Sequence, residues 1–226
     1  MAVQTGKTST DQRTSSKSTR DQLIEVSAGL LCTRGFSGFS YQDLANELGI
    51  RKASVHHHFA QKNDLGLALC DWTEQWLLQG FAHFDQQGTN ATDKLQRYLR
   101  AAAKHTFNEH KQCPVSALYS DLAVLPEAIQ ARMQELTAIE HQWVSGVFYA
   151  GLQSGELTSQ QSCPLSGLSD SAIKSAADDM ARLFVFSCKG ALFYARLQGE
   201  EFFYQSMDLL MQQWRPLKSA RRQEQS

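Results

Sequence analysis

The sequence predicts an all-α protein of about nine helices, arranged as a small N-terminal domain and a larger helical body. Three observations predict this fold class. The 226 residues include 14 glycines and only 4 prolines, so few residues are present to separate short strands. Apolar residues make up 42% of the chain, which is enough for a real core. Long segments also place apolar residues at helical spacing, and no segment shows a convincing strand pattern.

The first helix is predicted to begin at Thr19. This residue offers a capping oxygen, and Gln22 follows three residues later as its capping-box partner. Gly35 ends the helix as a left-handed cap. Residues 1–17 are rich in Ser, Thr, Lys and Gln, with almost nothing to bury, so we interpret them as a disordered tail.

Two short helices are predicted next. Ser40 and Asp43 have capping-box spacing before the segment YQDLANELG, which Gly49 ends. The segment KASVHHHF fits a third helix. The remaining predicted helices span residues 62–84, 91–108, a short stretch within 115–124, 126–153, 171–197 and 200–214. The predicted organisation is a tail at 1–17, a domain at 18–64, a body at 65–215 and a polar tail at 216–226.

The net charge of −1 conceals an asymmetry along the chain. Residues 1–62 carry eight Lys and Arg against five Asp and Glu, a net of +3, and the remainder carries fourteen against eighteen, a net of −4. A mildly basic N-terminal region followed by an acidic remainder favours an anionic partner for the N-terminal region.

Composition also limits location and chemistry. No apolar run of about 18 residues occurs, so no membrane span is expected, and the N-terminus lacks the apolar segment of a secretory signal. The 5 cysteines are dispersed without a CxxC pair, which points to reduced thiols in the cytoplasm. The chain has no nucleophile elbow, Gly-rich phosphate loop or HExxH motif, so we expect neither an enzyme nor a cofactor.

Three consecutive histidines, His56, His57 and His58, first suggest a metal site. Adjacent residues on a helix point about 100° apart, so three in a row cannot converge on one ion. Metal-binding histidines on a helix need the i, i+4 spacing. His105 and Glu109 have that spacing, but a solvated face explains this pair better than a metal. We therefore expect no metal site.

The segment from Tyr41 to about His58 fits a helix-turn-helix. Ala45 is the small residue needed where the second helix packs closely. Gly49 is the turn residue that tolerates a positive φ. Val55 is the branched apolar residue that anchors the recognition helix. Further apolar positions suit the small core of the domain: Leu44, Leu48 and Ile50.

Over residues 19 to about 67 the chain resembles the DNA-binding domain of the TetR family of transcriptional regulators. The resemblance rests on the Thr-Arg start, the RGF helix end, the helix-turn-helix, and HHHF followed by Lys62. The family's recognition helix usually reads Lys-Gly-Ser-Leu-Tyr-His-Tyr-Phe, so His56 and His58 stand where tyrosines are usual. The first tyrosine commonly contacts a phosphate, and that contact would pass to an imidazole. Gln61 replaces a small capping residue and caps poorly, which makes Asn63 the alternative cap.

This resemblance and the motif predict which residues meet DNA. Helix-turn-helix proteins place the N-terminal part of the recognition helix on base edges in the major groove. The expected groove residues are Arg51, Lys52, Ala53, Ser54 and His56. The expected phosphate donors are His57 and Lys62, with Thr19, Ser40 and Tyr41 as lesser candidates. His58 either packs against the first helix or faces DNA.

For the body, the resemblance implies a domain that binds a small-molecule effector and forms a homodimer. An effector site would use bulky residues of the middle helices and one cysteine: Trp72, Trp76, Phe107, Cys113, Tyr119, Trp143 and Phe148. Dimerisation would use the last two long helices, which are too apolar for helices with one side exposed to water. The expected interface residues are Phe184, Phe186, Gly190, Phe193, Tyr194 and Leu210. In both cases an ordinary monomer core is the alternative.

The segment KQCPVSALYSDLA resembles a subgroup of the family that has a Gly-Cys-Leu-like start to the sixth helix. This subgroup includes the repressor that responds to N-ethylmaleimide. Cys113 is the matching position. We expect it near a helix N-terminus with His110 and Lys111 close in sequence, which makes a thiol more reactive. An inert, half-buried cysteine is the alternative.

The sequence therefore predicts a homodimeric repressor that a small-molecule effector, or modification of Cys113, releases from a palindromic operator. The expected partners are double-stranded DNA, an unidentified effector and a second copy of the chain, with no membrane. The competing interpretation is a helical interaction protein whose head does not bind DNA, which the residues at His56, His58 and Gln61 leave open.

Overall fold

The computed structural model describes residues 17–159 and 169–216. In this part of the chain it contains nine α-helices, one π-helical turn, one 3₁₀ turn and no strand, which confirms the predicted all-α class. The helices are α1 (Thr19–Arg34), α2 (Tyr41–Leu48), α3 (Lys52–His58), α4 (Lys62–Gln87), α5 (Ala91–Ala103), α6 (Pro114–Ser120), α7 (Glu127–Gln153), α8 (Asp170–Gln198) and α9 (Glu200–Gln212). None of the described helices is long and apolar enough to cross a membrane. The tails predicted at 1–17 and 216–226 lie almost wholly outside the described residues.

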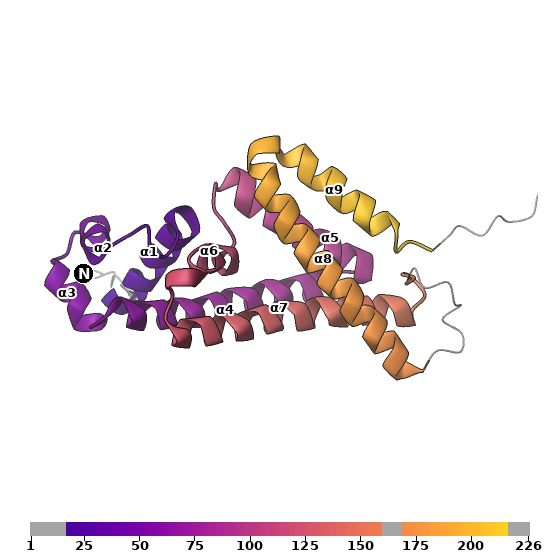
Figure 1. Ribbon diagram of the computed structural model, residues 1–226, viewed down its shortest axis with the longest axis horizontal. Helices are drawn as coiled ribbons and strands as arrows, with labels where there is room; N and C mark the ends of the chain where they lie inside the picture. Colours follow the sequence, from indigo (N-terminus) through magenta and orange to yellow (C-terminus); the bar gives the residue numbers. More distant parts are fainter. Residues whose placement is uncertain (1–16, 160–168, 217–226) are drawn as a thin grey trace, which may run out of the picture.

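Helices α1, α2 and α3 form a head at one end of the molecule (Figure 1). Its core contains Leu44 and Val55, both fully buried, and Ala45 is 1% exposed where α2 packs closely. Gly49 ends α2 with a φ of 64°, in the left-handed region that glycine adopts without a steric cost. The three positions that defined the helix-turn-helix in the sequence therefore have the expected environments.

Side-chain caps fix where the head helices begin. The Ser40 hydroxyl accepts a hydrogen bond from the Asp43 N–H at 3.4 Å, and the Asp43 carboxylate accepts one from the Ser40 N–H at 2.7 Å, as predicted. The cap of α1 differs from the prediction. The Ser18 hydroxyl accepts from the Asp21 N–H at 3.1 Å, and Thr19 is already helical. Both residues have a capping hydroxyl, so the sequence pattern misplaced the cap by one residue.

The start of α4 also corrects the sequence analysis. The Asp64 carboxylate accepts a hydrogen bond from the Gln61 N–H at 2.9 Å, which satisfies one free donor at this helix end. Asn63 lies inside the helix and does not serve as the substitute cap. A carboxylate three residues after the cap thus compensates for the poor capping side chain at Gln61.

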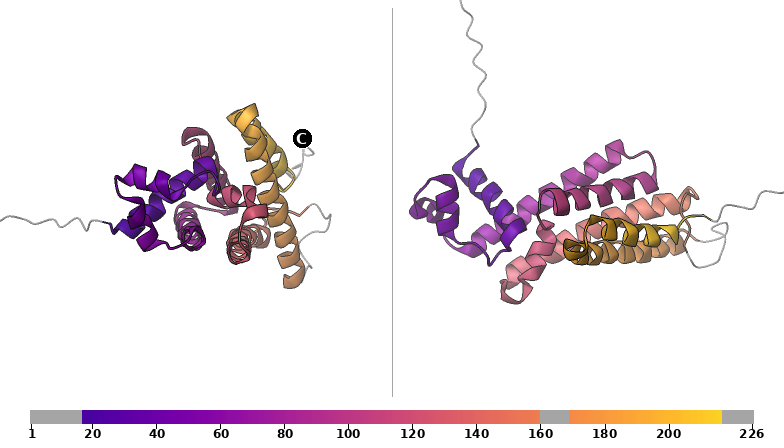
Figure 2. Two further views of the ribbon diagram at one scale, coloured as in Figure 1. Left: turned by 60° about the vertical axis from the view of Figure 1, so that its left-hand side comes forward. Right: turned by 90° about the horizontal axis from the view of Figure 1, so that it is seen from above.

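The long helix α4 leaves the head and runs through the body beside α7, and α8 crosses this pair (Figures 1 and 2). The most extensive helix contacts are those of α7 with α8, α8 with α9, and α4 with α7. Contacts between aromatic rings connect these helices. The Phe148 and Trp214 centroids lie 4.8 Å apart, and those of Phe148 and Phe184 lie 5.7 Å apart. The body therefore has an aromatic core shared by α7, α8 and the chain that follows α9.

The predicted helix at 91–108 ends earlier as an α-helix. It stops at Ala103 and continues as a π-helical turn over Lys104–Asn108. The chain then turns at His110, which has a positive φ of 53°. This path brings the next segment against α1, where the Gln112 N–H donates to the Cys32 carbonyl at 2.7 Å. The segment that follows the π-helical turn is thus held by a tertiary contact, which local helix propensity does not report.

Head and body meet at closely packed positions. A second hydrogen bond runs from the Ser37 N–H of the head to the Asp121 carboxylate at 3.1 Å, just after α6. On α4, a Cβ added to Gly66 would lie 2.4 Å from the Ile129 Cδ1 and 3.1 Å from the Phe36 Cζ. Gly66 therefore has no free volume beside it, although it occupies an ordinary helical position.

Two glycines of α4 provide a matched test of this packing. We expect Gly66→Ala to destabilise the fold by about 1–3 kcal/mol, because the added methyl overpacks the junction. At Gly80 an added Cβ meets nothing within 4 Å. Gly80→Ala should therefore stabilise the fold by about 0.5–1 kcal/mol through helix propensity. Urea unfolding at equal protein concentration measures both, and stabilisation by both substitutions would contradict the close packing.

Candidate functional site

The outer side of α3 carries the residues that the sequence predicts for the major groove. Val55 is fully buried and anchors this helix to the head. The predicted groove residues are exposed or half-exposed: Arg51, Lys52, Ala53, Ser54 and His56. His57 is exposed as well, whereas His58 is half-buried. The helix therefore presents a mixed basic and small surface that a partner can approach without unfolding the head.

The three histidine rings of α3 do not point toward a common centre. The His56 ring packs edge-on against the Tyr41 ring at 4.8 Å, and the His57 and His58 centroids lie 5.4 Å apart. Among the described residues, no group of three His, Cys, Asp or Glu side chains could hold a metal ion.

Two predicted phosphate donors face inward instead. The Tyr41 side chain is 6% exposed, its buried hydroxyl has no hydrogen-bond partner in the described part of the chain, and burial raises its pKa to about 12. The Lys62 ammonium donates to the Phe39 carbonyl at 2.5 Å and lies 4.8 Å from the centre of the Phe36 ring. Burial also lowers the pKa of Lys62, against the opposing effect of Asp121. Both side chains thus contribute to the packing of the head.

The remaining lesser candidates differ from each other. The Ser40 hydroxyl is occupied by its capping partner, to which it donates at 2.6 Å. Thr19 is exposed in the first turn of α1. Of the Ser40 and Thr19 side chains, that of Thr19 is therefore the one available for a hydrogen bond to a new partner.

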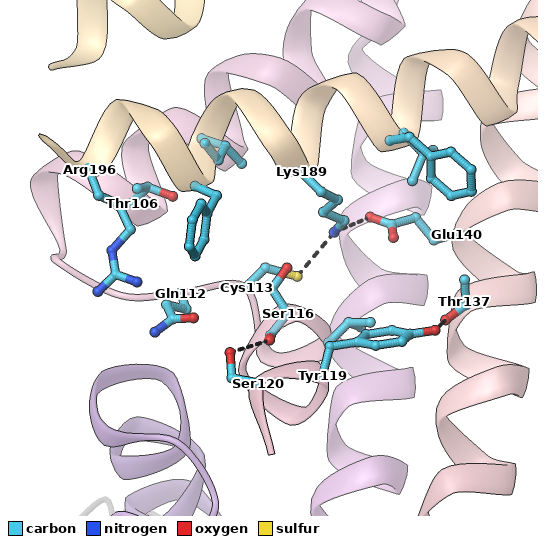
Figure 3. Close-up of a pocket in the computed structure, with 15 residues that line it drawn as sticks. Thr106, Gln112, Cys113, Ser116, Tyr119, Ser120, Thr137, Glu140, Lys189 and Arg196 are labelled. Carbon is cyan, nitrogen blue, oxygen red and sulfur yellow. Dashed lines mark hydrogen bonds and ion pairs between the residues drawn. The ribbon is translucent and has the colours of Figure 1, made fainter. Parts of the chain in front are cut away.

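Two cavities lie next to each other in the body. The first, of about 480 Å³, lies between α6 and α8 (Figure 3), and its lining includes Ser116, Tyr119 and Val185. The second, of about 410 Å³, is lined mainly by α4 and α5 and includes Trp76 and Tyr98. The two cavities share five residues: Thr106, Cys113, Glu140, Lys189 and Leu192. The shared wall therefore contains a carboxyl group (Glu140), an amine (Lys189) and a thiol (Cys113), and the rest of the lining is largely apolar.

A buried carboxylate organises this wall. Glu140 of α7 is 2% exposed, and its Oε1 accepts hydrogen bonds from the Tyr98 hydroxyl at 2.6 Å and the Lys189 ammonium at 2.8 Å. The same ammonium lies 3.3 Å from the Cys113 sulfur (Figure 3). Burial alone would lower the pKa of Lys189, but Cys113 and Glu140 outweigh it and hold the pKa above its usual range. Lys189 thus remains charged beside the thiol.

The described cysteines have different environments. Burial raises the pKa of Cys32 and of Cys188 to about 12, and that of Cys70 to about 11, so these thiols stay protonated near neutral pH. Cys113 is half-exposed, lines both cavities and precedes the first turn of α6. Among the described cysteines it therefore has the position suited to a reaction with a small molecule.

The cation beside Cys113 is not one of those predicted from neighbouring residues. The Lys111 ammonium pairs with Glu109 at 3.3 Å, and His110 is exposed. Lys189 comes from 76 positions further along the chain. The sequence did contain a signal for its partner. Glu140 lies on the buried stripe of α7, four residues from the fully buried Leu136 and Val144. A charge on such a stripe requires a partner.

The predicted effector residues divide into two groups. Cys113 and Tyr119 line the first cavity, and Trp76 lines the second. The others line neither cavity: Trp72, Phe107, Trp143 and Phe148. Phe148 is fully buried in the aromatic core, and Trp143 stacks on Phe81 with centroids 4.7 Å apart while its indole N–H donates to Asp85 at 3.1 Å. Apolar spacing identified bulky residues but not which of them face empty volume.

The predicted dimer residues divide similarly. Phe184 is fully buried and Leu210 is 8% exposed, so both belong to the core of one chain. Phe186, Phe193 and Tyr194 are 64%, 69% and 65% exposed, and Gly190 is exposed beside them. An apolar surface therefore remains on α8 after the single chain has folded.

The fold and site define a class: a helix-turn-helix head on a helical body with internal cavities. Residues 23–69 match the family described as bacterial regulatory proteins, tetR family. The repressor KstR2 of Mycobacterium tuberculosis is 27% identical over 106 residues, which cover 47% of this chain and 52% of that protein. The chain thus spans about half the length of the curated relatives it matches. These matches support a regulator of the TetR family.

Solved structures agree with this fold. A TetR-family regulator from Agrobacterium tumefaciens has a TM-score of 0.76 and 24% identity, covering 87% of this chain and 97% of its own. The reduced form of NemR from E. coli has a TM-score of 0.71 and 18% identity, with the same coverage of 87% and 97%. At these identities the likeness concerns the arrangement of the helices.

The buried ion pair predicts a clear stability pattern. Lys189→Met removes the cation and leaves the Glu140 carboxylate buried with only the Tyr98 hydroxyl. We expect a loss of about 3–5 kcal/mol, and a Lys189→Met, Glu140→Leu double variant should recover most of it. The control is Lys174→Met, because the Lys174–Asp170 pair is 64% and 57% exposed and should matter little. Equal urea unfolding curves for Lys189→Met and the control would contradict the proposed role of the pair.

Proposed function

We propose that this chain is a homodimeric transcriptional repressor, which a small molecule bound in the body or a modification of Cys113 releases from a palindromic operator. The observation that carries the proposal is the position of α6. This helix forms a wall of the first cavity and is flanked by hydrogen bonds to the head on both sides. A ligand site and a helix-turn-helix are thereby connected through one short element.

The head supplies the DNA-binding side of the proposal. Residues 1–62 carry a net charge of +3, which favours an approach to phosphates. Lys52 and Arg51 are exposed at the start of α3, where helix-turn-helix proteins contact base edges. One recognition helix reads few bases. Two heads about 34 Å apart, related by a two-fold axis, read a palindrome.

The coupling would run through α6. Gln112 lines the first cavity, and its N–H donates to the Cys32 carbonyl of α1 at 2.7 Å. At the other end of α6, Asp121 accepts from the Ser37 N–H at 3.1 Å. A ligand that displaces α6 therefore displaces the head with it. A small change in the separation of two heads is enough to prevent both from engaging their half-sites.

Cys113 offers a second, covalent route. Its sulfur lies 3.3 Å from the Lys189 ammonium and is half-exposed at the wall of both cavities, where a small electrophile could reach it. Addition to an electrophilic alkene forms a bond between sulfur and carbon, and the resulting enolate takes a proton from water. The product occupies volume in the cavity next to Gln112. Covalent and non-covalent ligands would thus act on the same wall.

The second candidate function is a helical interaction protein whose head does not bind DNA. One observation favours it: the Tyr41 hydroxyl is buried and the Lys62 ammonium is bonded to the Phe39 carbonyl, so neither group is free on the surface to meet a phosphate. The exposed residues of α3 still favour DNA. The binding measurement described next separates the two functions.

We expect Lys52→Ala to weaken binding to the operator by about 1–3 kcal/mol, and to weaken binding to a scrambled duplex less. Fluorescence anisotropy at low salt, with DNA from upstream of the protein's own gene, measures both. Lys174→Ala, an exposed lysine on α8, is the control and should bind as the wild type does. Lys62→Ala is a poorer test, because Lys62 also packs inside the head. A wild type that binds no duplex at low salt would favour the interaction protein.

Alkylation tests the covalent route. N-ethylmaleimide should release the wild type from DNA, whereas Cys113→Ser should bind DNA and resist release, because the other described thiols, Cys32, Cys70 and Cys188, are buried and react slowly. Mass spectrometry of the alkylated peptides identifies the modified cysteine in the same samples. If the wild type is fully modified at Cys113 and stays bound to DNA, the covalent route is wrong and a non-covalent ligand remains.

A further inference from the structure

We infer that a second copy of this chain closes the first cavity, so that the effector site is complete only in the dimer. This rests on the homodimer and effector site proposed above. It adds that one surface of α8 serves both, and that dimerisation and access to the cavity are therefore linked.

The first step is the pattern of exposed residues on α8. They recur at alternating spacings of three and four, which is the pattern of a seam between two helices. These residues, here called the α8 stripe, are Leu183, Phe186, Gly190, Phe193 and Leu197. Leu183 is 49% exposed and Leu197 is 94% exposed. The stripe has no charged residue, so it does not suit permanent contact with water.

The second step is the rim of the first cavity. Phe186 and Phe193 are 64% and 69% exposed, yet both also line this cavity. Their neighbours Val185 and Leu192 are buried on its inner wall. The two phenylalanines therefore stand at the mouth, with one side toward the cavity and one toward solvent. Anything that covers the stripe also covers this mouth.

The third step concerns the opposite side of the stripe. A groove of about 400 Å³ between α8 and α9 is lined by Gly190, Tyr194, Phe202 and Leu209, among others. Tyr194 and Leu209 are each 65% exposed. A Cβ added to Gly190 would meet nothing within 4 Å, so the chain leaves open space at the centre of the stripe. A helix of a partner could approach closely there.

A second copy fits this surface in size and symmetry. A whole aromatic side chain contributes about 150–250 Å². The exposed parts of Phe186, Phe193, Tyr194 and Phe202 therefore amount to roughly 350–600 Å². The exposed leucines Leu183, Leu197 and Leu209 add to this area, and a stable complex buries about 800 Å² per partner. Gly190 lies midway between Leu183 and Leu197 in sequence. A two-fold axis near it pairs leucine with leucine and phenylalanine with phenylalanine, as a symmetric interface requires.

A thiol placed only in the first cavity tests the closure. Ser116 lines the first cavity but not the second. We would introduce Ser116→Cys in a Cys113→Ser background and measure its reaction with a bulky dye-maleimide by peptide mass spectrometry. Leu197→Glu places a charge on the stripe and should dissociate the dimer. Leu78→Glu, at a 44% exposed leucine of α4, is the matched control.

If only the open monomer reacts, a sample that is about 90% dimer reacts about tenfold more slowly than the monomer, by mass action. We therefore expect a roughly tenfold faster reaction in the Leu197→Glu background than in the Leu78→Glu background. Sedimentation equilibrium fixes the oligomeric state of each sample. Equal rates for a dimer and a monomer would overturn the closure and leave the homodimer intact. A dimer that survives Leu197→Glu would overturn the stripe as its interface, and a wild type that stays monomeric would overturn the proposed homodimer itself.

Discussion

The carboxylate of Glu140 is the constraint on which the body depends. A charge that is 2% exposed is tolerable only with hydrogen-bonding partners, and it obtains them from two other helices. Tyr98 of α5 and Lys189 of α8 each place a donor on the same oxygen. These contacts hold α5, α7 and α8 at fixed separations around the shared wall. The ammonium beside Cys113 follows from this arrangement, since without Lys189 the buried carboxylate would keep only the neutral Tyr98 hydroxyl as a partner.

The connection to the head has a different physical basis. The Gln112 N–H and the Cys32 carbonyl are both backbone groups, and the Ser37 donor is a backbone group too. The first contact tolerates changes of side chain but not changes of chain position, whereas the second also needs the Asp121 carboxylate as acceptor. The junction is therefore sensitive to movement of α6 and, after α6, to the residue at Asp121. Close packing at Gly66 adds the same property, because it leaves no free volume to absorb a shift.

Local signals predicted the head well. The capping box of Ser40 and Asp43, the left-handed Gly49 and the small Ala45 depend on residues a few positions apart, and each has the expected geometry. The order and type of the helices followed from the same local patterns. The cap of α1 was misplaced by one residue because Ser18 and Thr19 carry equivalent hydroxyl groups.

The site in the body was predicted only in part, because its contacts join distant segments. Helical spacing shows which residues share a face, but it does not show which neighbouring helix that face meets. Phe148 and Tyr119 were therefore equivalent in the sequence, although one is core and the other lines a cavity. The inward turn of Lys62 depends on a carbonyl and two rings 23 to 26 positions away, at Phe39 and Phe36. The charge at Glu140 was the readable signal, and it was missed.

The proposed double use of α8, in effector binding and in dimerisation, has an evolutionary consequence. Val185 and Leu192 face the cavity and are buried, so substitutions there can change ligand preference without altering the outer surface. Leu183 and Leu197 face outward, so they can change without altering the cavity. Phe186 and Phe193 belong to both surfaces. After a gene duplication, these two positions would have to satisfy both demands at once, so a new ligand and a new pairing preference would tend to arise together there and separately elsewhere on the helix.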